Sequence, residues 1–420
     1  MSTNPNYAVM PFEDYRSACD AIRSKTGKTD PIKSGDLASE ITGIQNSGSS
    51  PSAPVKQKEV NFYDYDGTLL HSYTVEEAQA LTALPEGPSH DGLVFQGWNW
   101  SLEDVNALTR SMNIGALYTT DDGTTRIYIH LEEGRTSPML GVCPNGTVTV
   151  DWGDGTEPDT LTGTDTGATA VKWTPNHNYT EPGDYMIRLT VDGRIALNGD
   201  NLSNRYTYIL RHVGSDDTRN GTYQNAVQKI EVGDGVTSIG DYAFYNCSSL
   251  ASITIPDGVT SIGTYAFGGC YSLTSITIPD NVTSISSNMF DTCYSLTSIT
   301  VPDSVSSIGS NAFQNCSSLA SITIPDGVTS IGSNMFSYCY SLASITIPDT
   351  VTNIGNYAFR NCYGVCYYDF TNHSAVPTLS NTNAFSGISS DCEIRVPAAL
   401  YDEWIAATNW STYASYIVAV

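Results

Sequence analysis

The sequence is poor in charged residues and contains no long apolar run. Only 15% of its 420 residues are charged, and 19 Lys and Arg face 44 Asp and Glu, which gives a net charge of −25. Nucleic-acid binding and attachment to an anionic membrane both require a basic surface, so this balance argues against both partners. No run of about 18 apolar residues is present, so we also expect no membrane insertion. Hydrophobic residues still make up 40% of the chain, enough for packed cores.

The chain also offers few residues for catalysis or metal binding. Its six histidines are scattered, and no Ser/His/Asp or Cys/His arrangement is visible. Cys362 and Cys366 lack nearby histidine partners, which argues against zinc. Asp151, Asp154 and Asp184 could bind Ca²⁺, but turn formation explains each of these residues equally well. We therefore predict no catalytic residue, no enzyme activity, no cofactor and no metal site, and leave calcium open.

Two segments imitate enzyme motifs. Phe62–Leu70 resembles the first motif of haloacid-dehalogenase phosphatases, in which Asp64 would be the nucleophile and Asp66 the acid/base. That family also needs a doubly wound parallel sheet and a lysine, and no lysine occurs in the following 60 residues. We predict instead a hairpin in which Asp-Gly turns the chain. Thr26–Thr29 imitates a phosphate-binding loop, but Ile22 stands where the loop requires glycine.

A repeat of 23 residues organises the C-terminal half. In each copy an Ile-x-Ile pair alternates with Ser or Thr, which predicts a short strand, and Pro-Asp ends it. One copy cannot bury its apolar side but stacked copies can, so we predict a solenoid over residues 229–374. The repeat places its cysteines above one another, and we expect a structural ladder of packed thiols rather than disulfides. These residues are Cys247, Cys270, Cys293, Cys316, Cys339 and Cys362.

The repeats resemble the BspA-like class of leucine-rich repeats from bacterial surface antigens. The resemblance covers Ile230–Tyr367 and implies a leucine-rich-repeat solenoid. A last strand is expected near Cys392–Pro397, followed by an amphipathic stretch that carries Trp404 and Trp410. Because a solenoid needs a cover over its last open coil, we predict that residues 375–420 form a C-terminal cap.

Two small β modules are predicted upstream of the repeats. Residues 58–115 resemble the internalin B-repeat family, which implies a β-grasp-like module, on the strength of Val60–Thr68 and Asp91–Trp98. Residues 116–195 resemble a polycystic-kidney-disease (PKD) type of immunoglobulin-like sandwich. That resemblance rests on the W-G-D-G-T, H-x-Y and P-G-x-Y motifs, found at 152–156, 177–179 and 182–185. Residues 196–228 form a polar connector to which we assign no structure.

Helical periodicity predicts short helices within residues 1–45, followed by a Ser/Pro/Gly-rich linker at 46–57. Such helices cannot bury a core alone, so we expect them to attach the chain to partner proteins or to other copies. Ala21–Ile41 resembles a segment common near the start of phage and prophage tail proteins. The fold class predicted is mainly β: a short α-helical N-terminal anchor, a β-grasp-like module, an immunoglobulin-like (PKD) sandwich and a C-terminal leucine-rich-repeat solenoid with a cap.

Differences between the repeats indicate where a ligand could bind. The outward strand positions are a nearly uniform array of Ser and Thr, which we interpret as a solvated face. Tyrosine instead varies from copy to copy after the Ile-Gly turn and beside the cysteines. Its ring offers contact area at little entropic cost and its hydroxyl suits glycans or polar protein surfaces, although simple packing of coil edges is an alternative. The predicted ligand-binding residues are Tyr242, Tyr265, Tyr271, Tyr294, Tyr338, Tyr340, Tyr357 and Tyr363.

We expect a non-enzymatic virion tail, baseplate or tail-fibre protein of a phage or prophage. It would join other tail proteins through residues 1–45, form a homo-oligomer such as a trimer, and recognise a bacterial surface glycan or protein receptor through its repeats. Its location would be the virion tail, assembled in the host cytoplasm. Met1–Met10 lacks the basic and apolar regions of a signal peptide, which favours this expectation. The alternatives are a bacterial cell-surface adhesin of the BspA-like class and a capsid decoration protein.

Overall fold

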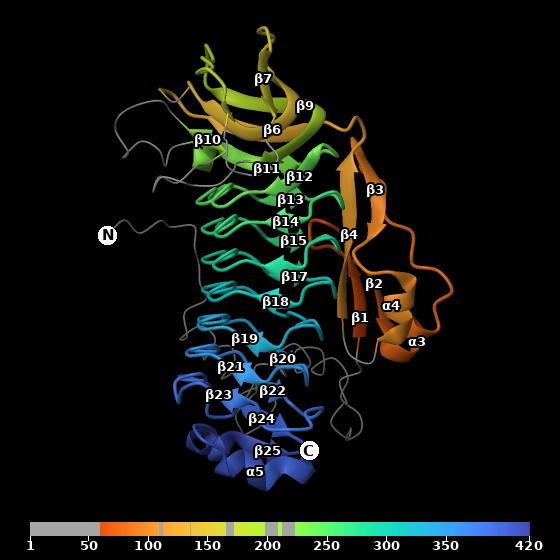
Figure 1. The fold of residues 1–420 in the computed structure, drawn as a ribbon, viewed down its shortest axis with the longest axis vertical. Helices are drawn as coiled ribbons and strands as arrows, with labels where there is room; N and C mark the ends of the chain where they lie inside the picture. The colour runs from red at the N-terminus through yellow and green to blue at the C-terminus, as the bar shows by residue number, and fades with distance from the viewer. Residues whose placement is uncertain (1–58, 109–111, 135, 165–171, 198–208, 212–222) are drawn as a thin grey trace, which may run out of the picture.

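The computed structural model describes residues 59–108, 112–134, 136–164, 172–197, 209–211 and 223–420. This part of the chain is mainly β, with β-sheet units at its N-terminal end and a β-solenoid at its C-terminal end (Figure 1). The predicted anchor at 1–45, the linker at 46–57 and the loop-like motif at Thr26–Thr29 lie outside the described residues. No helix in the described ranges is long and apolar enough to cross a membrane.

The first β unit is a four-stranded sheet with two short helices. Its elements are β1 (Glu59–Tyr63), β2 (Leu69–Thr74), α3 (Val75–Gln79), β3 (Leu93–Trp98), α4 (Leu102–Ala107) and β4 (Met112–Thr120). The strand order is β2-β1-β4-β3, with a parallel pair in the middle and antiparallel pairs outside. Capping boxes at Thr74 and Ser101 start the two helices. Strand β4 continues five residues past position 115, the predicted boundary of the module.

A core of its own holds the first unit together. Phe62 and Trp98 meet edge to face with ring centroids 4.8 Å apart, and Val60, Ile114 and Val105 are buried beside them. This cluster is separate from the large core that runs through the rest of the described chain. The first unit therefore has the packing of an independent module, while its membership of the internalin B-repeat family stays a prediction.

The second β unit is an antiparallel set of strands in which β6 and β9 are the longest. Its elements are β5 (Thr125–Leu131), β6 (Met139–Asp151), β7 (Asp159–Thr164), β8 (Lys172–Trp173), β9 (Gly183–Leu197) and β10 (Leu210–Arg211). The W-G-D-G-T and H-x-Y motifs meet here, because the Tyr179 hydroxyl donates to the carbonyl oxygen of Trp152 at 2.8 Å. Trp152 is fully buried and stacks on His177, with ring centroids 4.6 Å apart. The PKD-like assignment itself stays a prediction.

Strand pairing joins the second unit to the solenoid. Strand β5 pairs antiparallel with β11 (Val227–Glu231), and β9 pairs parallel with β12 (Val236–Ile239), within one ten-stranded sheet. One apolar core runs from Ile127 in β5 to Ile417 near the C-terminus. An open first coil would expose unpaired backbone groups, and β5 supplies their partners. The second unit thus covers the first coil rather than standing apart from it.

The solenoid stacks short parallel strands, one or two from each coil. On one side lie β11, β13 (Ser252–Thr254), β15 (Ser275–Thr277), β17 (Ser298–Thr300), β20 (Ser344–Thr346), β22 (Tyr367–Asp369), β24 (Glu393–Val396) and β25 (Ile417–Ala419). The second row is β12, β14 (Ser261–Ile262), β16 (Ser284–Ile285), β18 (Ser307–Ile308), β19 (Ser330–Ile331), β21 (Asn353–Ile354) and β23 (Thr378–Leu379). The pairs are in register, for example Ile276 with Ile299, so identical side chains lie above one another.

Two ladders of identical side chains fill the interior of the solenoid. Successive phenylalanine rings stack. The ring centroids of Phe267 and Phe290 lie 5.6 Å apart, and the angle between the ring planes is 3°. The six repeat cysteines are free and fully buried, and each thiol from Cys270 onward donates to a backbone carbonyl of the preceding coil, as Cys293 does to Phe267 at 3.2 Å. Burial raises the pKa of the Cys362 thiol to about 12. These thiols are packed core groups with no thiolate character at neutral pH.

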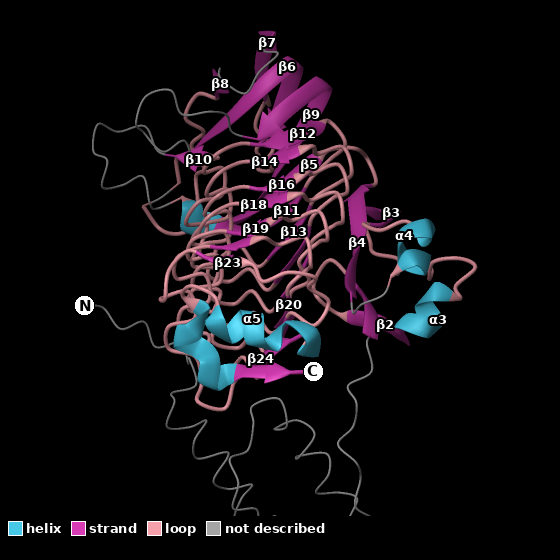
Figure 2. Cartoon of the chain, turned by 60° about the horizontal axis from the view of Figure 1, so that its bottom comes forward, coloured by secondary structure: helices cyan, strands magenta, loops and turns pink. Residues whose placement is uncertain are grey.

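The C-terminal segment adds a further coil before it covers the stack. Strands β23 and β24 pair with β21 and β22, and Phe385 stacks on Phe359 at 5.2 Å, so the stack continues through Val396. Beyond it lie η4 (Ala398–Leu400), α5 (Tyr401–Ala406) and η5 (Trp410–Tyr416), at the foot of the solenoid in Figure 1 and in front of its coils in Figure 2. Trp404 and Trp410 are fully buried there. The cover therefore begins at Ala398, later than the predicted cap at 375.

Candidate functional site

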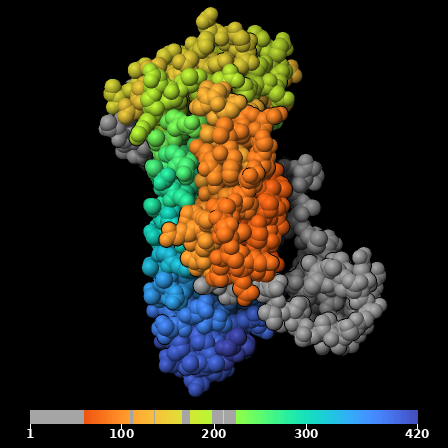
Figure 3. All heavy atoms as spheres, turned by 90° about the vertical axis from the view of Figure 1, so that its right-hand side faces the viewer, coloured from red at the N-terminus to blue at the C-terminus, as the bar shows by residue number. Residues whose placement is uncertain are grey.

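The Ser/Thr face of the solenoid is covered by the first β unit. We expected this face to be solvated, but Thr254, Thr277 and Thr300 are only 2%, 7% and 3% exposed. Strand β4 contacts β13, β15 and β17, and the orange unit lies against the solenoid coils in Figure 1 and Figure 3. The expectation is wrong for these coils. Farther along, Ser344 and Thr346 are partly exposed.

Small side chains on both surfaces permit this close contact. A Cβ atom at Gly115 of β4 would lie 2.4 Å from the hydroxyl oxygens of Thr277 and Thr300. The Ser275 hydroxyl donates to the carbonyl oxygen of Tyr65 at 2.9 Å. A flat array of hydroxyl groups lacks bulky side chains that would hold a second sheet away, and Ser275 finds its acceptor on the first unit. Here the Ser/Thr array serves contact within the chain.

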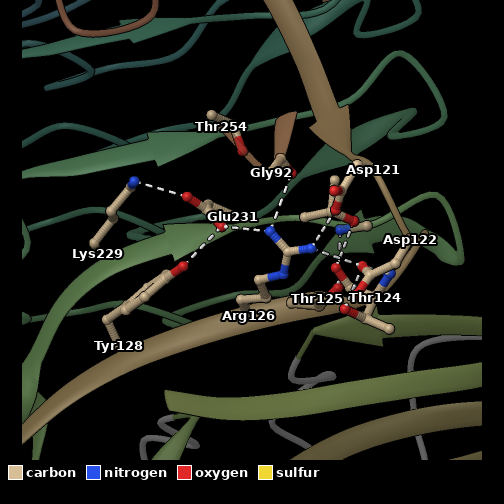
Figure 4. A network of polar contacts seen from close by, with 12 residues as sticks. Gly92, Asp121, Asp122, Thr124, Thr125, Arg126, Tyr128, Lys229, Glu231 and Thr254 are labelled. Atoms are coloured by element: carbon tan, nitrogen blue, oxygen red, sulfur yellow. Dashed lines mark hydrogen bonds and ion pairs between the residues drawn. The ribbon is translucent and has the colours of Figure 1, made fainter. Parts of the chain in front are cut away.

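Arg126 joins all three parts of the structure near one end of this contact (Figure 4). Its guanidinium donates to the carbonyl oxygen of Gly92 in the first unit at 3.0 Å. It also pairs with Asp121 and Asp122 in the turn after β4, and lies 3.3 Å from Glu231 on β11. The Arg126 side chain is only 10% exposed, so losing any one of these partners would leave charge poorly solvated.

Glu231 is the buried carboxylate of this junction. It is 3% exposed, accepts a hydrogen bond from the Tyr128 hydroxyl at 3.0 Å and pairs with Lys229 at 2.7 Å (Figure 4). Together with Arg126 these groups use its acceptor capacity within the protein. The cluster therefore works as a joint between the units, and Glu231 has no acceptor left for a ligand.

Four of the predicted tyrosines form one column on the solenoid. Tyr271, Tyr294, Tyr340 and Tyr363 each follow a ladder cysteine and so occupy the same coil position. Tyr271 stacks on Tyr294 with centroids 5.2 Å apart, and Tyr340 stacks on Tyr363 at 5.7 Å. Tyr294, Tyr340 and Tyr363 are 39%, 37% and 52% exposed. Partial burial and the neighbouring Tyr363 raise the pKa of Tyr340, so its hydroxyl stays a donor at neutral pH.

The other four predicted tyrosines occupy strained backbone positions. Tyr242, Tyr265 and Tyr357 follow the Ile-Gly turn with φ values of 58°, 55° and 56°, and Tyr338 precedes a ladder cysteine with φ of 67°. Other coils place asparagine at these positions, as Asn288 does at 57°. The left-handed region costs an ordinary L-residue about 1–2 kcal/mol, and asparagine tolerates it better. The chain keeps tyrosine where the backbone favours asparagine.

Arg360 adds a cation to the C-terminal group of tyrosines. Its guanidinium lies 5.3 Å above the ring of Tyr338 and 5.2 Å above that of Tyr357. Tyr338 also meets Tyr340 edge to face at 6.1 Å. No other Lys or Arg occurs in the repeats between residues 237 and 366. We call the eight predicted tyrosines together with Arg360 the tyrosine edge.

Asp64 and Asp66 shape the hairpin that the sequence predicts. Strands β1 and β2 form it, and Asp66 accepts a hydrogen bond from the Thr68 N–H at 2.9 Å. Asp64 is 5% exposed, and its Oδ2 lies 2.8 Å from His90 Nε2. Burial, and then the charge of Asp64, raise the pKa of Tyr118. The sheet around them is mixed and four-stranded, unlike the doubly wound sheet that phosphatase chemistry needs.

The three carboxylates considered for calcium are used separately. Asp154 Oδ2 lies 2.8 Å from His177 Nε2, and Asp184 Oδ1 lies 2.7 Å from His130 Nδ1. Asp151 accepts a hydrogen bond from the backbone of the turn that follows it. Within the described ranges, no group of three or more His, Cys, Asp or Glu residues could hold a metal ion.

Comparison with known families identifies the repeats. A family model described as a BspA type leucine rich repeat region matches residues 237–366 in six copies. The repeats of this chain are BspA type leucine-rich repeats. The matched region contains the cysteine ladder and the whole tyrosine edge, and it excludes both upstream β units. A search of curated proteins found no match to the chain.

Solved structures of bacterial leucine-rich-repeat proteins resemble the chain. The leucine rich repeat protein of T. pallidum is 34% identical, covers 31% of this chain and 62% of its own, and has a TM-score of 0.29. A leucine-rich repeat protein from Bacteroides ovatus is 26% identical, and the match covers 41% of this chain and 56% of that protein, with a TM-score of 0.31. A leucine rich cell surface protein of Faecalibacterium prausnitzii is 24% identical, and the match covers 50% of this chain and 86% of that protein, with a TM-score of 0.23. The chain spans less than two thirds of the first two proteins.

Two features of the BspA type region escaped sequence reasoning. One is Arg360, whose signal is its isolation as the lone cation among tyrosine-rich repeats. The other is the cover over the strand face, which the Ser and Thr themselves do not signal because they suit water and a neighbouring sheet equally well. The eight tyrosines do lie at the coil positions that the 23-residue period assigns to them. Their role in binding stays a prediction.

Proposed function

We propose that this chain is a non-enzymatic binding protein that holds a ligand of the bacterial surface on its tyrosine edge. The strained tyrosines carry this proposal. Four of them have positive φ values between 55° and 67°, where other coils use asparagine. Strain of this kind persists where the side chain is needed for something other than stability. The column tyrosines Tyr294, Tyr340 and Tyr363 add exposed aromatic rings, which suit contact with polar ligands.

The covered strand face supports the same proposal. Strand β4 buries Thr254, Thr277 and Thr300, so a ligand cannot reach those coils without displacing the first unit. The tyrosine edge needs no such movement, because Tyr294, Tyr340 and Tyr363 are between 37% and 52% exposed. The outward positions of the second strand row, such as Ser261 and Ser284, are exposed too, but they are uniform, whereas the tyrosines vary from coil to coil.

We place the protein at the bacterial cell surface, as an adhesin of the BspA-like class, with a surface glycan or protein as its receptor. The BspA type match favours this alternative over the virion tail. The tail and capsid proposals have no support among the relatives reported above. Attachment through residues 1–45 and assembly into a homo-oligomer stay predictions, since that segment lies outside the described residues.

Replacing three tyrosines of the edge tests the proposal. Tyr265→Ser, Tyr271→Ser and Tyr294→Ser together should abolish binding of the purified full chain to the bacterial strain that binds it best. Buried aromatic anchors dominate interface energetics, so losing three of them removes most of the affinity. Circular dichroism and the melting curve should keep the β-rich profile of the unmodified chain.

The matched control removes exposed apolar side chains from the first unit. Leu69 and Val94 are 51% and 48% exposed, so Leu69→Ser with Val94→Ser changes surface hydrophobicity away from the edge. This variant should bind cells as the unmodified chain does. Cell binding that survives the tyrosine changes would move the receptor site elsewhere, and equal loss in both variants would show that the adhesion is non-specific.

A further inference from the structure

The column of tyrosines that follow the ladder cysteines is interrupted once. Going from coil to coil, the positions are Ser248, Tyr271, Tyr294, Ser317, Tyr340 and Tyr363. Each tyrosine pair is stacked within itself, and Ser317 alone separates the two pairs. The column therefore consists of two stacked tyrosine pairs, with serine in place of tyrosine in the coil between them.

The missing ring leaves room for one planar group. Adjacent coils repeat at a strand spacing of about 4.8 Å, so Tyr294 and Tyr340 stand about 10 Å apart on either side of Ser317. A ring midway between them would lie about 5 Å from each, within the range for aromatic stacking. The observed spacings in the column, 5.2 Å and 5.7 Å, are of this size. Both flanking tyrosines are exposed, at 39% and 37%.

A hydroxyl group lies at the interruption. The Ser317 hydroxyl donates to the carbonyl oxygen of Tyr294 at 3.3 Å and keeps an acceptor for a ligand. A ligand between the rings would thus meet an aromatic face on either side and the Ser317 hydroxyl beside it.

We propose that the interruption at Ser317 binds one pyranose ring of β-gluco configuration between Tyr294 and Tyr340. This deepens the proposed function and rests on it. A sugar held between two aromatic rings must present an apolar face to each of them. In the β-gluco configuration every ring substituent is equatorial, so both faces carry only C–H groups. In the galacto configuration an axial hydroxyl would be pressed against one ring without a hydrogen-bond partner.

Charge also restricts the ligand. The chain has a net charge of −25, which disfavours acidic sugars and phosphate-bearing polymers. Neutral glucose or N-acetylglucosamine units meet this condition as well as the stereochemical one. The proposed ligand is therefore a neutral β-linked glucan or N-acetylglucosamine polymer of a cell surface.

Titration calorimetry on the full chain tests the stereochemical part. The probes are cellotetraose and chitotetraose, with β-1,4-galactotetraose as the epimeric control. At least one of the two gluco-configured probes should bind, and the galacto probe should bind about tenfold more weakly or not at all. Equal binding of the galacto probe, or failure of both gluco probes at millimolar concentration, overturns the proposal. Binding of N-acetyltyrosinamide alone would overturn it in favour of an aromatic side chain from a partner protein.

Filling the interruption tests the location. Ser317→Tyr supplies the missing ring at the natural spacing, so it should abolish tetrasaccharide binding while the melting temperature stays equal or rises. Ser248→Tyr, at the end of the same column, extends the stack without filling the gap and should bind as the unmodified chain does. Tyr340→Ser removes one of the two flanking rings, which are exposed, and should weaken tetrasaccharide binding by about tenfold or more, which keeps the test valid if Ser317→Tyr folds poorly. Unchanged binding by a folded Ser317→Tyr variant overturns the proposal.

The same variant separates this inference from the proposed function. If Ser317→Tyr still binds cells while the Tyr265, Tyr271 and Tyr294 variant does not, the edge binds the cell surface but the sugar site is wrong. If neither variant changes cell binding, the proposed function itself fails.

Discussion

At the scale of single residues, the repeats contain two kinds of position. At some, core packing explains the residue type, and at others packing and backbone preference do not explain it. The ladder cysteines and phenylalanines are fully buried and recur in every coil because each stacks on its own copy. The tyrosines follow a different logic. Tyr242, Tyr265, Tyr338 and Tyr357 occupy left-handed positions that asparagine fills in neighbouring coils, so the backbone gains nothing from them. A side chain retained against local backbone preference is a strong indication of function.

Exchange of strained tyrosines for asparagine tests this reasoning. Tyr242→Asn with Tyr265→Asn relieves about 1 kcal/mol of backbone strain per residue. It also removes three ring contacts, the stack of Tyr242 on Tyr265 at 5.1 Å and an edge-to-face contact of each ring with Tyr245 at 5.5 Å, together worth about 2 kcal/mol. The two effects nearly cancel, so urea unfolding should give a free energy of unfolding within about 1 kcal/mol of that of the unmodified chain, while cell binding falls. Destabilisation by about 2 kcal/mol or more would mean that these tyrosines serve packing.

At the scale of elements, the sequence pattern predicts the coils well and the contacts between units poorly. Strands such as Ser275–Thr277 recur at a 23-residue period, and the hairpin at Asp66 follows from its Asp-Gly turn. The period cannot show that β4 covers β15 and β17, because Ser and Thr have no preference between water and a neighbouring sheet. The signal that exists is Gly115, a glycine within a strand, which often marks close approach of another backbone.

Adding a side chain at Gly115 tests the contact between β4 and the solenoid. Gly115→Val suits a strand but places atoms where Thr277 and Thr300 lie, so it should lift the first unit from the face. A Thr300→Cys reporter, at a position 3% exposed, then measures the opening through its rate of maleimide labelling. We expect labelling to rise by about tenfold or more, since local opening governs access to a buried thiol.

The control for this experiment is a glycine with free space around it. The nearest atom to a Cβ at Gly258 would be 3.6 Å away, so Gly258→Ala should leave the reporter slow. Labelling that stays slow in Gly115→Val as well would show that the first unit is not held by this close approach.

At the scale of the whole molecule, the solenoid is closed on three sides by other parts of the same chain. The second β unit pairs with its first coil through β5, and Trp404 and Trp410 cover its last coil. The first unit covers the Ser/Thr face and is fastened by Arg126, which contacts all three parts (Figure 4). The tyrosine edge stays accessible, as does the uniform Ser row of β14, β16, β18 and β19, and the central claim of the account is that the edge is the binding surface.

Hydroxyl-radical footprinting of the full chain, with and without bacterial cell-wall fragments, tests that claim most directly. Tyr294, Tyr340 and Tyr363 are exposed, so they should be oxidised in the free protein and protected when the fragments bind. Tyr118, 1% exposed, should stay unreactive in both states because it lies in the first unit's own core. Protection confined to the first unit, or no change at the three exposed tyrosines under conditions where the fragments bind, would contradict the account.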